Sequence, residues 1–174
     1  MTDHILSDGV VTLRAVEVTD VAALMMWEND SSQWDTSCPT APFSHRQMWE
    51  YASSYNGDIA ASGGIRLMVT LQASGQSVGT IDLYDYNAMH RRASIGVFIA
   101  PGLRRKGYAR RAVAIAVGYA RHIGLNQLTA EVAADNEASA KLMASCGFEA
   151  RGTLKEWFRR GKTYADALIM QRPA

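Results

Sequence analysis

A long helix-forming segment between two strand-like segments constrains the fold of this chain most. Residues Tyr108–His122 are rich in alanine and valine and contain no proline, and Gly124 follows as a helix-ending residue. The flanking segments Arg92–Ala100 and Leu128–Ala134 are predicted strands. A helical crossover joins parallel strands, so we expect these two strands to run parallel, with a largely buried helix between them. Ligands tend to bind at the carboxyl ends of such strands.

Short connections predict antiparallel pairing elsewhere in the chain. Ile65–Ala73 and Val78–Tyr86 precede the strand Arg92–Ala100 with only a few turn residues between them, which indicates an antiparallel meander. The C-terminal segments Phe148–Glu156 and Tyr164–Gln171 are predicted to form a final hairpin. The sheet is therefore expected to be mixed.

One further strand and three further helices complete the predicted elements. The strand is Val10–Arg14, and Asn29–Pro42 and Asn56–Gly64 are expected to be loops. The helices, with their candidate capping residues, are Val21–Glu28 after Thr19 or Asp20, His45–Tyr55 after Ser44, and Glu137–Ser145 after Asp135 or Asn136. We predict one domain over residues 1–174, of the α/β or α+β class: a mixed, mostly antiparallel sheet of about seven strands flanked by about four helices.

Composition excludes several classes of protein. Apolar residues make up 48% of the 174 residues and the net charge is +1, which favours an ordinary globular domain over a nucleic-acid binder. Cys38 and Cys146 are too few for a disulfide framework, and the four scattered histidines show no metal-ligand spacing. Without a signal-like N-terminus or a membrane-spanning apolar run, we expect a cytoplasmic protein with no metal and no membrane partner.

The segment before the long helix has the features of a phosphate site. Arg104, Arg105, Lys106, Arg110 and Arg111 concentrate positive charge at the start of the helix, where free backbone N–H groups and the helix dipole favour anions. The intervening Gly107 permits a close approach of the backbone, and Ala109 is small. The alternative interpretation is a solvated basic loop, because short glycine motifs also occur by chance.

Several motifs resemble the GCN5-related N-acetyltransferase (GNAT) family. Arg104-x-x-Gly107-x-Ala109 is similar to the family's pyrophosphate signature. The strand opening His90-Arg91-Arg92-Ala93 resembles bacterial spermidine acetyltransferases and ribosomal-protein N-terminal acetyltransferases. Asn136, Ser139 and Ala140 before Gly147-Phe148 resemble the second signature of these relatives, and the similarity runs from about Val10 to Gln171.

The resemblance implies the acyl-CoA N-acyltransferase fold, acetyl-CoA as co-substrate and a primary amine as acceptor. The strand before the loop would present backbone groups to pantetheine, and one N–H there would polarise the thioester carbonyl. The residues implied in cofactor binding are Val97, Phe98 and Ile99 on the strand, Arg104, Arg105, Lys106, Gly107, Tyr108 and Ala109 in the loop, and Asn136.

The catalytic residues depart from the family pattern at two positions. Many relatives have a tyrosine acid where this chain has Met143, and a glutamate where it has Ser94. Ser139 is the candidate acid, and Glu28 and Asp82 are the candidate bases. Other acids near the expected cleft are Asp30, Asp35, Asp85 and Glu131, and the tryptophans that could line an acceptor pocket are Trp27, Trp34, Trp49 and Trp157.

Three functions remain open. The first is acetylation of a small amine, with polyamines favoured because Trp27–Asp35 carries three acids. The second is acetylation of a protein N-terminus, as in the ribosomal-protein relatives, and the third is a CoA-binding module that has lost catalysis. A closed acidic pocket would favour the first and a wide groove the second. Relatives are often dimers or larger, so a homo-oligomer is also considered.

Overall fold

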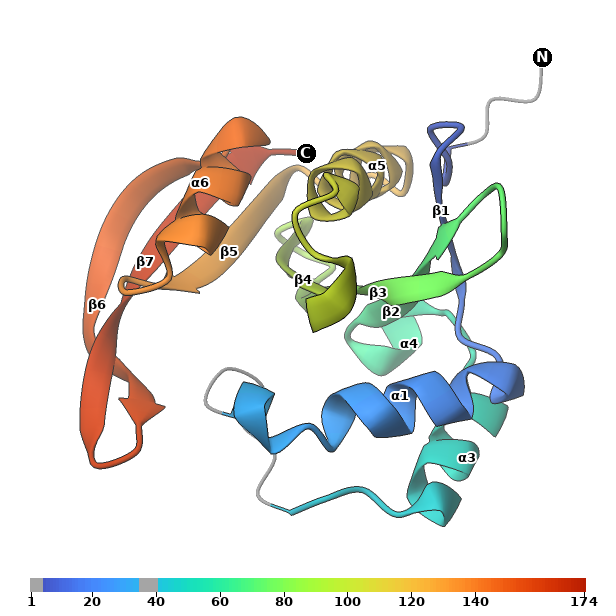
Figure 1. Cartoon of the computed structure of the whole chain (residues 1–174). Coiled ribbons are helices and arrows are strands. Elements are labelled where there is room, and N and C mark those ends of the chain that lie inside the picture. Colours follow the sequence, from blue (N-terminus) through green and yellow to red (C-terminus); the bar gives the residue numbers. More distant parts are fainter. Residues whose placement is uncertain (1–4, 35–40) are drawn as a thin grey trace.

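The computed structural model describes residues 5–34 and 41–174 and contains one seven-stranded sheet (Figure 1). The strand order is β1-β2-β3-β4-β5-β7-β6, and only β4 and β5 pair in parallel. The strands are β1 Val11–Ala15, β2 Ile65–Leu71, β3 Ser77–Asn87, β4 Arg92–Ile99, β5 Gln127–Ala133, β6 Glu149–Arg160 and β7 Thr163–Pro173. This confirms the predicted mixed, mostly antiparallel sheet, including the meander, the parallel crossover and the final hairpin.

Helices cover both faces of the sheet. The long crossover helix α5 and the shorter α6 lie on one face, and α1 and α3 pack together on the other (Figure 1). The bounds are α1 Val21–Glu28, α3 His45–Ser53, α4 Ile59–Ser62, α5 Tyr108–His122 and α6 Glu137–Ser145, with short 3-10 turns η1 Val18–Asp20, η2 Ser31–Gln33 and η3 Pro101–Leu103. None of the helices within the described ranges has the length and apolar character needed to cross a membrane.

The sheet separates two apolar clusters by strand alternation. On β2, Ile65, Leu67 and Val69 belong to the cluster beneath α5, whereas Met68 belongs to the cluster beneath α1 and α3. The predicted burial of α5 is confirmed for one side, because Ala112, Val113, Ala116 and Ala120 are at most 2% exposed. Cys146 is buried in the same cluster.

Two local predictions need correction. The segment Asn56–Gly64, expected as a loop, contains α4, because the Asp58 carboxylate accepts bonds from the backbone N–H groups of Ala60 and Ala61. Asp20 precedes α1 but makes no side-chain cap to it. Its two carboxylate oxygens instead accept 2.7 Å bonds from the guanidinium of Arg14 on β1.

Strands β4 and β5 remain paired over only three residues. The ladder runs from Arg92–Gln127 to Ser94–Thr129, and the hydroxyl oxygens of this last pair are 3.1 Å apart. Beyond it the two strands diverge, as Figure 1 shows. The divergence opens the sheet at the carboxyl end of β4, immediately before the basic loop.

Candidate active site

A cleft of about 580 Å³ occupies the region where β4 and β5 diverge. One wall is β4 from Ile95 to Ile99, and the opposite wall is β5 from Ala130 to Ala133. The predicted residues that line it are Val97, Phe98, Ile99, Arg104, Arg105, Ala109, Asn136 and Ser139. The structure therefore brings most of the implied cofactor residues together around one opening.

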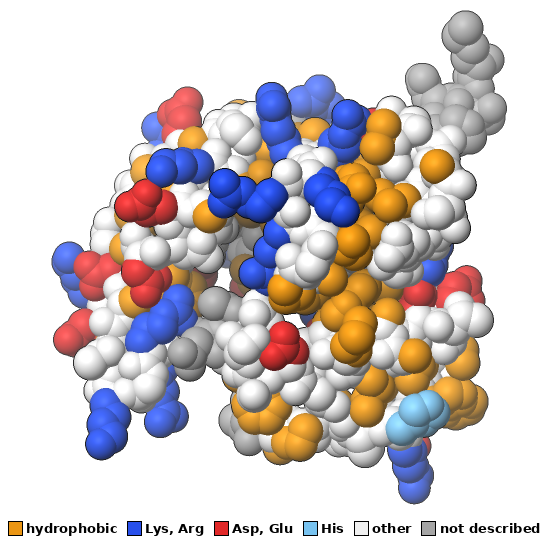
Figure 2. Space-filling view, in the orientation of Figure 1, with side chains coloured by type: hydrophobic (Ala, Val, Ile, Leu, Met, Phe, Trp, Pro, Cys, Tyr) orange, Lys and Arg blue, Asp and Glu red, His pale blue; other side chains and the backbone are white. Residues whose placement is uncertain are grey.

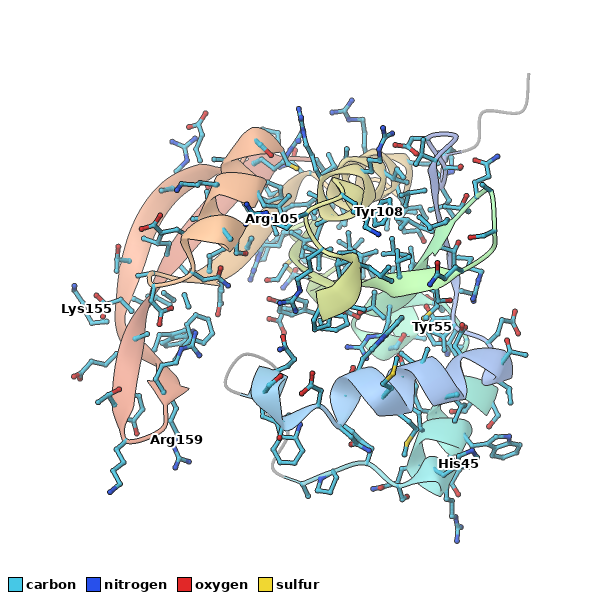
Figure 3. All side chains as sticks on the ribbon, viewed as in Figure 1. His45, Tyr55, Arg105, Tyr108, Lys155 and Arg159 are labelled. Carbon is cyan, nitrogen blue, oxygen red and sulfur yellow. The ribbon has the colours of Figure 1, made fainter. Side chains whose placement is uncertain are left out.

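The start of α5 has no side-chain cap. Its N-cap residue is Gly107, with φ of 81° in the left-handed region that favours glycine, and no side chain in residues 5–34 or 41–174 caps the first turn. Arg105 also has a positive φ of 67°, and its side chain reaches the cleft between α5 and α6 (Figure 3). Figure 2 shows Lys and Arg side chains gathered over this region. Uncapped N–H groups beside guanidinium groups form a site suited to a phosphate.

Arg104 turns back onto the protein. Its Nε donates to the carbonyl of Ile99 at 2.8 Å, and its Nη2 donates to Oε1 of Gln33 at 2.8 Å. The guanidinium also lies over the Phe98 ring, 5.8 Å from the centroid. Arg104 thus joins the end of β4 to the η2 turn on the opposite face of the sheet.

The start of α6 forms the other side of the cleft. Asn136 caps the helix, and its Oδ1 accepts from the backbone N–H of Ser139 at 3.1 Å. Ser139 is partly exposed, and Met143, which is 3% exposed, lines the cleft below it. The position that carries a tyrosine in many relatives therefore supplies an apolar wall here.

A second cavity, of about 700 Å³, lies beside the first on the α1–α3 face. Its lining includes Tyr51, Tyr55, Tyr84, Asp82, Asp85 and Arg66. Tyr84 on β3 lines both cavities. Burial, with Glu131, Asp85 and Asp82 nearby, raises the pKa of Tyr84 to about 12, so its hydroxyl stays protonated at neutral pH.

Arg66 links the two predicted bases. Its Nη1 is 2.7 Å from Oε1 of Glu28, and its Nε is 2.6 Å from Oδ1 of Asp82. Burial would lower the pKa of Arg66, but the two carboxylates, Asp82 first, raise it above its usual range. Glu28 and Asp82 are therefore both ion-paired with Arg66, and of the two acids only Asp82 lines the second cavity. Their predicted role as bases stays a prediction.

The other predicted residues lie outside both cavity walls. Lys106 and Gly107 are exposed, and Tyr108 packs against the core beneath α5. Among the tryptophans, Trp27 on α1 is buried, Trp34 donates to the carbonyl of Glu28, and Trp49 and Trp157 are exposed. Asp30 caps η2, and Asp35 falls outside the described residues. No group of three or more His, Cys, Asp or Glu side chains suited to a metal ion occurs in the described ranges.

Sequence reasoning missed the tyrosines and Arg66. The alternation along β3 carried a signal, because Asp82 and Tyr84 share the face opposite the apolar Ile81 and Leu83. The register that places Arg66 directly across from Asp82 depends on the hairpin pairing of β2 with β3, which strand prediction alone does not fix.

The chain is similar in sequence to known acetyltransferases. The acetyltransferase (GNAT) domain family matches residues 11–149. An uncharacterized N-acetyltransferase of Bacillus subtilis is 34% identical over 107 residues, which are 61% of this chain and 60% of that protein. The spermidine N(1)-acetyltransferase of Vibrio cholerae is 30% identical over 164 residues, 92% of this chain and 91% of that protein.

Solved structures agree with the sequence matches. The Vibrio cholerae spermidine N-acetyltransferase in complex with CoA and spermine has a TM-score of 0.83 and 26% identity, covering 95% of this chain and 96% of its own. A dodecameric structure of that enzyme has a TM-score of 0.79 and 27% identity, covering 95% of both chains. The likeness confirms the predicted fold.

Proposed function

Because the chain belongs to the GNAT family of acetyl-CoA-dependent N-acetyltransferases, we propose that it acetylates a small cationic amine of the polyamine class. One observation carries this choice of acceptor. The cavity beside the cleft is lined by tyrosines and by Asp82 and Asp85, which suit an extended molecule with several ammonium groups. The similarity to a spermidine N-acetyltransferase supports the same acceptor class.

For the donor, we propose that the cleft between β4 and β5 holds acetyl-CoA. The uncapped start of α5 and the guanidinium of Arg105 suit its pyrophosphate, and Ala109 leaves room beside the helix end. No β5 partner pairs with β4 beyond Ser94, so the backbone groups of Val97 and Ile99 that point away from β3 face the opening, whereas the Phe98 carbonyl points to Gly79 on β3. Acetyl-CoA supplies an acyl thioester, and a backbone N–H on this wall would polarise its carbonyl.

Ser139 is the proposed proton donor for the departing thiolate. It lines the cleft at the first turn of α6, where the Asn136 cap fixes the backbone beneath its side chain. A thiol with a reference pKa of about 8.5 needs little assistance to leave, so a single hydroxyl with solvent behind it suffices. The ion-paired Glu28 and Asp82 contribute negative charge on the acceptor side.

The test follows thiol release from acetyl-CoA with a panel of amines. Spermidine and spermine represent polyamines, and lysine represents small amines outside the polyamine class. Peptides with free N-termini represent protein acceptors. We expect the polyamines to have the highest kcat/KM. A preference for peptides would replace the proposal by N-terminal acetylation. CoA binding by calorimetry without turnover on any amine would favour a binding module.

We propose in addition that the protein forms a homo-oligomer. The dodecameric Vibrio cholerae relative supports this, as do the exposed apolar side chains of Met26 on α1, which is 66% exposed, and of Trp49 on α3, which is 48% exposed. Light scattering in solution tests it, and a monomer at all concentrations would refute it.

A further inference from the structure

We propose that Glu131 of β5 is the general base that accepts the proton of the acceptor ammonium, and that Trp157 of β6 holds it in position. The proposal rests on the acetylation of an amine described above. Glu131 lines the cleft on the β5 wall, and its Oε2 accepts a bond from the indole Nε1 of Trp157 at 2.9 Å. Its Oε1 has no hydrogen bond to another described residue.

Strand alternation places Glu131 on the acceptor side of the opening. Ala130 and Val132 belong to the cluster beneath α5 and α6, so Glu131 between them points to the other face. Thr129, two residues earlier, shares that face and contacts Ser94 on β4. The acetyl donor would bind against the start of α5. A base on the opposite face of the sheet would then lie on the side from which the amine approaches the acetyl carbon.

Sheet register brings Glu131 into line with the second cavity. Arg66, Asp82 and Gly96 lie opposite one another across β2, β3 and β4. Continuing the β4–β5 register past Ser94–Thr129 would bring Glu131 opposite Gly96, at the point where the strands have diverged. An amine that extends from the second cavity toward the cleft would therefore meet Glu131 across the gap.

Gly96 keeps this path open. It has no side chain, and the ring of Tyr84 lies over it, with Cε1 3.6 Å from the position a Cβ would take. Tyr84 thus reaches both cavities, and its pKa is raised partly by Glu131, which places the phenol and the carboxylate near one another. The two side chains flank the expected route of the amine.

Glu131 differs from the other acids of the site in its partners. Glu28 and Asp82 are ion-paired with Arg66, whereas Glu131 forms no ion pair with any cation of the described residues. It is also exposed, so a proton that it accepts can pass to water. The other charged groups lining the cleft are Arg104 and Arg105 beside α5 and Arg160 on β6.

The acceptor ammonium loses two protons during the reaction. An N–H bond of the ammonium breaks and an O–H bond forms at Oε1 of Glu131, which leaves a neutral amine with a free electron pair. That pair forms the new N–C bond to the acetyl carbon while the C–S bond breaks, and the nitrogen, which is now cationic, loses its second proton to water. The sulfur takes one proton, either from solvent or from Ser139, whose hydroxyl is then reprotonated by solvent. Glu131 then releases its proton to water. Trp157 acts only by positioning the carboxylate.

The first test compares Glu131→Gln with the wild type. We expect kcat to fall by roughly 100-fold at pH 7, within the usual range for loss of a general base, while the CoA dissociation constant from calorimetry stays within about twofold. The deficit should shrink as the pH rises toward the amine's own pKa of about 10, where the acceptor deprotonates unaided. The control Glu149→Gln removes an exposed carboxylate paired with Arg151 and should leave kcat unchanged.

The second test observes the Trp157 indole N–H by NMR. Trp157→Phe identifies its signal, which should shift with pH in the wild type and lose that shift in Glu131→Gln. Trp157→Phe should lower kcat with little change in KM. A Glu131→Gln enzyme within threefold of wild-type kcat, a deficit that is the same at every pH, or an indole signal indifferent to Glu131 would each overturn the inference. A wild type that acetylates no amine would instead refute the proposed function, and the inference with it.

Discussion

Replacement of Gly79 by alanine tests the packing that positions the cofactor wall. A methyl group at this position of β3 would lie 2.0 Å from the carbonyl oxygen of Phe98 and 2.9 Å from the Cα of Ile99, and all of these are strand backbone. The two strands would have to separate by about 1.4 Å to reach the ordinary contact distance of 3.4 Å. The neighbouring bond from Ala100 N–H to the carbonyl of Val78, now 2.9 Å, would lengthen or break.

The cost follows from these contacts. Overpacking costs about 1–3 kcal/mol, and a lost ladder bond costs about 1 kcal/mol. We therefore expect Gly79→Ala to lower the free energy of unfolding by roughly 3 kcal/mol, which corresponds to a fall in Tm of about 6–12 °C for a domain of this size. Because the shift falls on Phe98 and Ile99, the affinity for CoA should fall as well.

Denaturant unfolding and calorimetry measure the two effects. Gly118→Ala is the matched control, because a Cβ there meets nothing within 4 Å and the residue lies inside α5. It should raise stability by up to about 1 kcal/mol. A Gly79→Ala protein within about 1 kcal/mol of the wild type, with normal CoA affinity, would refute the reasoning.

Three further predictions follow from the site and its supports. Gly107→Val should strain the φ of 81° by about 1–2 kcal/mol and abolish CoA binding measured by calorimetry, whereas unchanged binding would contradict the placement of the phosphates. Arg105→Ala should weaken CoA binding about tenfold, and less so at high salt, because it removes a charge from the cleft wall. Asp20→Asn should destabilise the fold by about 2 kcal/mol at pH 7. Burial raises the pKa of Asp20, but bonds from Arg14 and Glu17 lower it overall. The difference in free energy of unfolding between the wild type and Asp20→Asn should therefore be fully present above about pH 4. It should disappear as the pH falls through the lowered pKa of Asp20 in the folded protein. Equal stability of the two proteins at pH 7 would contradict the Arg14 pairing.

The sequence predicted most of the elements because its local signals agree with one another. The bounds of α5 and of α6 match the predicted ones, since glycines and the Asn136 cap mark their ends. The missed helix α4 is a single turn, and its Asp58 cap is indistinguishable in sequence from a polar loop residue. Short elements of this kind depend on a side-chain bond that composition does not reveal.

The part of the site that lies close together in the sequence was predictable. The basic loop, the start of α5 and Asn136 follow one another at fixed distances along the chain, so motifs locate them. The second cavity and the Glu131–Trp157 contact join residues from separate strands, and their proximity depends on register across the sheet. Register is a property of the folded pairing, which no single segment contains.

The short β4–β5 ladder has a consequence for how the protein avoids unwanted association. Where pairing stops after Ser94–Thr129, each strand acquires an unpaired edge inside the molecule. Unpaired edges on a protein surface invite strands of other chains and promote aggregation. Here the two edges face each other across a cleft inside the molecule, which residues of α5 and α6 also line, and so they do not lie on the outer edge of the sheet. The interruption in the ladder therefore adds no strand edge where a strand of another chain would pair with the sheet.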